Sequence, residues 1–235
     1  MPHGLALYFT SWIDNKGRSN EIMEATIYAD KQLTMTMQEF IDADVFYPSS
    51  RRRIKKLFAG REALSAIDVL ELEIPNNEKL RAVLREELIP LHTLHKLAVE
   101  FARAALVRER EAGREPDERC WRALDVKLAW LDGKASDEEL EAANAAADAA
   151  ATDAARAASR ATARATAWAA YWAAKAAASA TNATVWAATN AAAWATWAAA
   201  TDASGDADLA AWDAAKDDVR AEQVGIVKRM LGLAI

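Results

Sequence analysis

"NNEKLRAVLREELIPLHTLHKLAVEFARAAL", residues 76–106, carries the best conventional core pattern in this chain of 235 residues. Its large apolar side chains recur every three or four residues, which is the spacing of one helix face. They are Leu80, Val83, Leu84 and Leu88 in the first half, and Leu94, Leu97, Phe101 and Leu106 in the second. Pro90 separates the halves and suits the first turn of a helix, where its missing N–H costs no hydrogen bond. The stretch therefore predicts two core helices.

The residues that follow predict more helix. "PDERCWRALDVKLAWLDG", residues 116–133, repeats the apolar spacing, and Ser136 and Glu139 then stand in the spacing of a capping box. An alanine-rich segment follows, with 34 alanines among residues 142–201. Because alanine has the highest helix propensity, we expect one long helix over 135–203, about 90 Å long if unbroken, with a bend left open. A final amphipathic helix is predicted over 206–232, packed on the core.

Five tryptophans stand in the alanine-rich segment. At about 100° per residue they share an arc of roughly 80° on the helix surface. They are Trp168, Trp172, Trp186, Trp194 and Trp197. This tryptophan ridge either packs on the leucine-rich helices of its own chain or forms an interface with a second copy or a partner helix.

The N-terminal part differs in composition. "LALYFTSWI" and "EIMEATIYA" are rich in β-branched and aromatic residues and flank the turn-like "DNKGRSN", which predicts a β-hairpin within residues 1–35. A helical core domain is predicted over 36–134, opened by a capping box of Thr36 with Glu39. The predicted fold is mainly α: a helical bundle with a long Ala/Trp-rich helix and a small N-terminal β-hairpin element.

One short run is strongly basic. "RRRIKK" places Arg51, Arg52, Arg53, Lys55 and Lys56 on a predicted helix. Three interpretations stay open: a solvated helix face, a surface for an acidic protein partner, or a nucleic-acid contact. The net charge of −6 argues against general nucleic-acid binding, because no second basic stripe accompanies the run.

No constellation of catalytic, cofactor-binding or metal-binding residues is recognisable, so we expect a protein that is not an enzyme and has no cofactor. His92 and His95 lie three residues apart, but no third ligand stands beside them, and an ordinary boundary pair is the preferred interpretation. The single cysteine, Cys120, fits a reducing cytoplasm. Residues 176–201 lack formal charge, yet they hold five threonines, two asparagines and a serine, which argues against a membrane span.

The order of these elements resembles the immunity proteins of bacterial polymorphic-toxin systems, and equally a group of bacteriophage proteins with Ala/Trp-rich C-terminal helices. The resemblance covers residues 78–231 and is carried by "KLRAVLREELIPLHTLHKLAVEFARAAL", "PDERCWRALDVKLAWLDGKASDEELEAANAAADAA" and the Ala/Trp run. It implies an all-helical protein without enzymatic activity that acts by binding a toxin or a host factor.

The sequence thus favours a cytoplasmic binding protein that inhibits a partner protein. Two alternatives stay open. One is a self-assembling scaffold that associates through the tryptophan ridge, and the other is an enzyme with an unrecognised site. Light scattering separates a self-assembling scaffold from a monomer.

Overall fold

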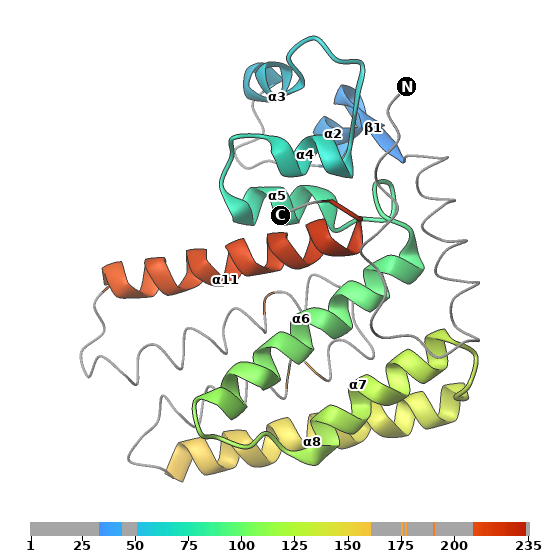
Figure 1. Ribbon diagram of the computed structural model, residues 1–235, viewed down its shortest axis with the longest axis vertical. Coiled ribbons are helices and arrows are strands. Elements are labelled where there is room, and N and C mark those ends of the chain that lie inside the picture. Colours follow the sequence, from blue (N-terminus) through green and yellow to red (C-terminus); the bar gives the residue numbers. More distant parts are fainter. Residues whose placement is uncertain are drawn as a thin grey trace.

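The computed structural model describes residues 33–43, 51–160, 175, 177, 190 and 209–233. This part of the chain forms eight helices and one two-stranded antiparallel sheet, so the predicted mainly α fold is confirmed (Figure 1). In chain order the elements are β1 (Thr34–Thr36), α2 (Met37–Asp42), α3 (Arg51–Phe58), β2 (Ala63–Ser65), α4 (Ala66–Glu71), α5 (Asn76–Val83), α6 (Leu91–Glu111), α7 (Glu118–Leu131), α8 (Asp137–Arg160) and α11 (Leu209–Met230).

The small sheet pairs β1 with β2, with Met35 opposite Leu64. Both of these side chains are buried in the core. Neither strand was predicted as such: β1 follows the two strand-like segments of the predicted hairpin, and both strands are only three residues long and directly precede a helix. Residues 1–32 of the predicted hairpin segment lie outside the described residues.

Each strand leads directly into a helix through a capping box. Thr36 receives a hydrogen bond from the Glu39 amide, and the Glu39 carboxylate accepts one from the Thr36 amide at 2.7 Å, which confirms the predicted start of α2. Ser65 and Asp68 repeat the arrangement at the start of α4. These side chains satisfy backbone N–H groups that have no partner inside the helix.

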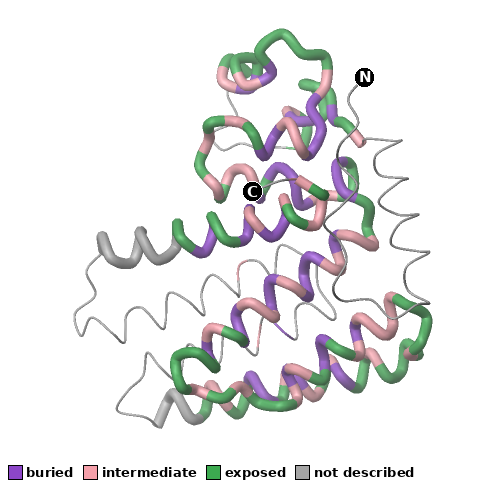
Figure 2. The backbone as a smooth tube through the Cα atoms, in the orientation of Figure 1, coloured by how far each residue is buried: buried purple, intermediate pink, exposed green. Residues whose placement is uncertain are grey.

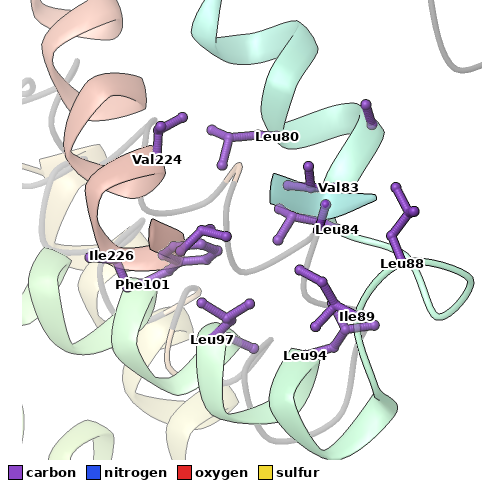
Figure 3. Packing of buried hydrophobic residues seen from close by; sticks show 14 of the residues in the cluster. Leu80, Val83, Leu84, Leu88, Ile89, Leu94, Leu97, Phe101, Val224 and Ile226 are labelled. Atoms are coloured by element: carbon purple, nitrogen blue, oxygen red, sulfur yellow. The ribbon is translucent and has the colours of Figure 1, made fainter. Parts of the chain in front are cut away.

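The main core lies where α5, α6 and α11 meet. Apolar side chains from the three helices point toward one another (Figure 3). They include Leu80 and Val83 of α5, Leu97 and Phe101 of α6, and Val224 and Val227 of α11, all at most 6% exposed. Burial of each such side chain contributes about 1.5–3 kcal/mol, so this junction stabilises the whole molecule.

The predicted helix over 76–88 is shorter than expected. Helix α5 ends at Val83, and Leu84 leaves helical geometry with a ψ of 63°. A tight turn over 84–89 follows, in which the Arg85 carbonyl accepts the amides of Leu88 and Ile89. Pro90 restricts the backbone of Ile89, the residue before it, and does not account for the end of α5 at Val83. Leu88 is nevertheless fully buried, so the apolar pattern predicted burial correctly and helix length wrongly.

Helices α7 and α8 lie side by side and run antiparallel (Figure 1). Their contact is made mostly of small side chains, because Ala123 of α7 packs on Ala143 and Ala147 of α8. Ser136 and Glu139 form the predicted capping box before α8.

The alanine-rich segment is not one straight helix. The ammonium of Lys175 lies 2.8 Å from the carboxylate of Asp148, although 27 residues separate them. On an unbroken helix the two would be about 40 Å apart. A straight rod of 90 Å is therefore wrong, and the alternative of a change in direction holds. Ala177 is fully buried in the main core, and Asn190 accepts a hydrogen bond of 2.7 Å from Arg220 of α11.

Candidate functional site

Helix α3 contains the basic run and lies at one end of the described structure (Figure 1). Its inner face is apolar. Ile54 and Phe58 are at most 2% exposed, and the ring of Phe58 meets that of Phe40 edge to face at 5.5 Å. The helix forms because its apolar residues recur at helical spacing and bury against α2.

The basic side chains occupy the opposite face. If Arg51 is set to zero, helical geometry puts Arg52, Lys55 and Lys56 between about 40° and 140°. The buried and half-buried positions of α3 lie between about 200° and 340°. Arg51, Arg52, Lys55 and Lys56 are all exposed, and the turns of α3 show this division in Figure 2. We call these four residues the α3 basic face.

Arg53 has a different role from its four basic neighbours. Its guanidinium lies 2.5 Å from the carboxylate of Glu78, which stands on α5. Both side chains are at least two-thirds buried, so the pair fastens α3 to the next part of the core. Of the five predicted basic site residues, the structure thus keeps four on one surface and gives the fifth a structural contact.

The C-terminal end of α3 is held tightly. Ala59 and Gly60 both have positive φ, 49° and 84°. This left-handed backbone conformation is typical of the residues that end a helix. Arg61 then donates to the carbonyls of Phe58 and Leu57 and pairs with Asp68 at 2.9 Å. Because Asp68 belongs to the capping box of α4, this arginine joins the end of α3 to the start of α4.

The charges on the α3 basic face oppose the local stability of the helix. Arg51 stands four residues before Lys55, and Arg52 four before Lys56, so two like-charged pairs each cost about 0.2–0.5 kcal/mol. The first turn contains no acidic residue, and its three arginines, Arg51 and Arg52 of the basic face among them, lie at the positive end of the helix dipole. The two lysines in the last turn are favourable to that dipole. Within the described part of the chain, none of the four forms an ion pair.

The predicted tryptophan ridge lies outside the described residues. The structure describes none of its five residues, which are Trp168, Trp172, Trp186, Trp194 and Trp197. The question of core or interface at the ridge therefore stays a prediction.

The histidines belong to a second cluster, at the junction of α6, α7 and α8. His95 meets the ring of Trp130 edge to face at 6.1 Å, and the ammonium of Lys127 lies 4.1 Å from the centre of the same ring. Trp130 donates its indole N–H to Asp137, the first residue of α8, at 2.7 Å. The sequence pointed to His92 and His95 but not to Lys127. Its position three residues after Leu124, on the apolar stripe of α7, was the available signal.

Electrostatics in this cluster follow from burial. Lys127 is 2% exposed, and burial lowers the pKa of its ammonium to about 8. Burial also lowers the pKa of His95, and the nearby charges of Lys127 and His92 lower it further. Among the described residues no group of three or more His, Cys, Asp or Glu side chains is arranged to hold a metal ion. The contacts of the cluster join α6, α7 and α8 to one another.

Cys120 is fully buried, and burial raises the pKa of its thiol to about 12. Because the thiolate is the reactive form, this side chain is a poor nucleophile near neutral pH.

None of the described helices has the length and apolar character that a membrane crossing requires. Comparison with protein-family models, curated proteins and solved structures finds no match to this chain.

Proposed function

We propose that this chain is a protein-binding protein without catalytic activity, which inhibits or neutralises a partner protein through surface recognition. The observation that carries the proposal is the α3 basic face, a set of four exposed cations on a helix whose other face is fixed in the core. The resemblance of residues 78–231 to immunity and bacteriophage proteins supports the same class of function. The partner is then a toxin or a host factor.

The firm attachment of α3 to the rest of the fold supports a role in recognition. Helix α3 is held by buried Ile54 and Phe58, by the Arg53–Glu78 pair and by the contacts of Arg61 with Asp68. A surface held in its binding geometry before contact loses little conformational entropy on association. Charged residues on such a surface raise the rate of encounter with an oppositely charged partner.

We place this function in the cytoplasm. The sequence has a single cysteine, and that thiol is buried with a raised pKa. A chain with one inaccessible thiol is suited to a reducing compartment.

Affinity capture from the native host, or from its phage-infected culture, tests the proposal. The full chain is immobilised, retained proteins are identified by mass spectrometry, and each candidate is then purified and its binding measured by calorimetry. We expect one protein that binds stoichiometrically and loses its activity on binding. Failure of every candidate to bind the purified chain contradicts the proposal. Light scattering of the purified chain across concentrations supplies the control for self-association.

A further inference from the structure

We propose that the α3 basic face is the docking surface for a compact acidic patch on a partner protein. The inference rests on the proposed function and specifies the chemistry of the partner. Four exposed cations, Arg51, Arg52, Lys55 and Lys56, share one face of the helix, and none has a carboxylate partner in the described part of the chain. A partner that brings carboxylates to this face supplies the missing pairs.

The ion pairs in and just after α3 distinguish the cations that hold the fold together from those that are available to a partner. Arg53 lies between the exposed and the buried face of the helix, pairs with Glu78 and is two-thirds buried. Arg61 is used to cap the helix and to hold Asp68. Both cations that contact the rest of the fold are therefore paired, while the four that face outward are not. This division shows that the unpaired cations do not hold the fold together.

The placement of the charges also runs against helix stability. Like charges at i and i+4, and two arginines at the positive end of the helix dipole, weaken the isolated helix. Sequences that break a local rule in this way do so most often at functional sites. An acidic partner reverses the effect, because its carboxylates neutralise both the like-charged pairs and the unfavourable first turn.

The size of the face favours a protein over a nucleic acid. Eight residues of helix extend about 12 Å, whereas duplex DNA carries a charge about every 1.7 Å over a much longer distance.

The arginines also suit carboxylate partners in geometry. A guanidinium presents a planar fork of N–H donors that matches the two oxygens of a carboxylate. Arg51 and Arg52 can each bind one side chain in this way, and Lys55 and Lys56 add charge one turn further along.

Stability of the free protein gives the first test. We expect R51Q/R52Q to melt at the same temperature as the wild type or about 1–3 °C higher, because repulsion within α3 is removed. K134Q/R156Q is the control for net charge, since it removes two exposed cations elsewhere, which pair with Asp132 and Asp153, and changes the net charge equally. Melting of R51Q/R52Q well below this control means that the chain itself already pairs these arginines, and it overturns the proposal.

Binding gives the second test, with fluorescent poly-L-glutamate as the acidic probe and a duplex DNA of equal charge as the alternative. We expect the full chain to bind poly-glutamate at about 50 mM salt. The affinity should fall as the salt concentration is raised, because salt screens the contact. R51Q/R52Q should bind about tenfold more weakly and R51K/R52K should be weakened less than that, because lysine keeps the charge but loses the planar fork, while K134Q/R156Q should bind nearly as the wild type does. Equal weakening in K134Q/R156Q, or no binding by the wild type, overturns the proposal. Tighter binding of DNA through the same arginines assigns the face to nucleic acid and also overturns it.

The two proposals fail in different ways. If the partner found by affinity capture binds R51Q/R52Q as well as the wild type, the protein is a binding protein that uses another surface. If no partner exists but poly-glutamate binds through α3, the surface chemistry holds and the proposed function fails.

Discussion

Lys127 is the most unusual single residue in the described part of the chain, because it buries a positive charge without a carboxylate beside it. Its ammonium contacts the face of Trp130, at 4.1 Å from the ring centre. Such a contact contributes about 0.5–2 kcal/mol, less than the cost of removing an ammonium from water. The lowered pKa of Lys127, about 8, reports that cost directly.

Replacing Lys127 by methionine should therefore stabilise the protein near neutral pH. Methionine fills a similar volume without the charge, so we expect the free energy of unfolding to rise by about 1–2 kcal/mol. Urea denaturation measures the change. The exposed Lys134 supplies the control, since K134M should stay within about 0.5 kcal/mol of the wild type. A fall in stability for K127M greater than that of K134M contradicts the prediction.

His95 should make stability depend on pH in the mildly acidic range. Its pKa in the folded protein lies below the ordinary value of 6.5, first because of burial and then because of the charges of Lys127 and His92. As pH falls through 6.5 the unfolded chain takes up the proton first, so the free energy of unfolding decreases. The stabilising contribution is complete above 6.5 and is lost below it.

Urea denaturation at about pH 7.5 and about pH 5 tests this dependence. Other groups titrate over the same range, so the comparison is between the wild type and H95Q. We expect the wild type to lose more stability on acidification than H95Q does. Equal losses in the two proteins mean that His95 does not contribute.

At the level of elements, the strand–cap–helix unit is used twice. β1 leads into α2 through Thr36 and Glu39, and β2 leads into α4 through Ser65 and Asp68. The pairing of the two strands fixes the starts of both helices relative to each other. Because Asp68 also binds Arg61, the second unit positions the end of α3 as well.

Removal of the second cap should weaken this arrangement. We expect S65A to lower the free energy of unfolding by about 1–2 kcal/mol, because Ser65 is 2% exposed and its loss leaves the Asp68 amide without its partner. T36A is the matched variant, with the same cap geometry at an exposed site, and should cost less. Urea denaturation compares them. A smaller loss for S65A than for T36A would show that burial does not strengthen the cap.

At the scale of the whole molecule, residues far apart in sequence are brought together. Helix α11 packs on α5, α6 and α4, so the end of the described chain completes a core begun more than 140 residues earlier. An ion pair of Arg108 with Glu222 joins α6 to α11. Asp148 and Lys175 join two parts of the alanine-rich segment across 27 residues.

Spin labels at positions 148 and 175 should report a short distance. In D148C/K175C, electron double resonance should give less than about 25 Å, compared with about 40 Å for a continuous helix. Cys120 is buried and its thiol has a raised pKa, so it does not compete for the label. E138C/D148C within α8 is the control and should give about 15 Å from the helix rise. A distance near 40 Å between 148 and 175 contradicts the arrangement.

Much of the fold could be read from local patterns. The apolar spacing of Leu94, Leu97 and Phe101 predicted α6, and the capping boxes at Thr36 and Ser136 predicted where two helices begin. These features depend on residues within one or two turns of each other. The end of α5 was missed because the apolar pattern continues to the buried Leu88, whereas the backbone already leaves helical geometry at Leu84.

The candidate site was predicted in part. The sequence identified all five basic residues of α3, since a charge run is visible by itself. It did not separate Arg53 from the other four, because that distinction depends on Glu78, which lies 25 residues away. The cluster around Lys127 was missed for the same reason, since His95 and Trp130 belong to different helices.

The sequence by itself determined that this protein is mainly helical, where most described helices begin and which residues they bury. Those properties follow from propensity, capping and periodicity, which act over a few residues. Only the tertiary structure decided that Asp148 and Lys175 meet, that α11 packs on α4, α5 and α6 in particular, and that four of five basic residues on α3 stay unpaired. Those outcomes depend on long-range packing, because the charge left available at a surface is what remains after distant segments have made their own contacts.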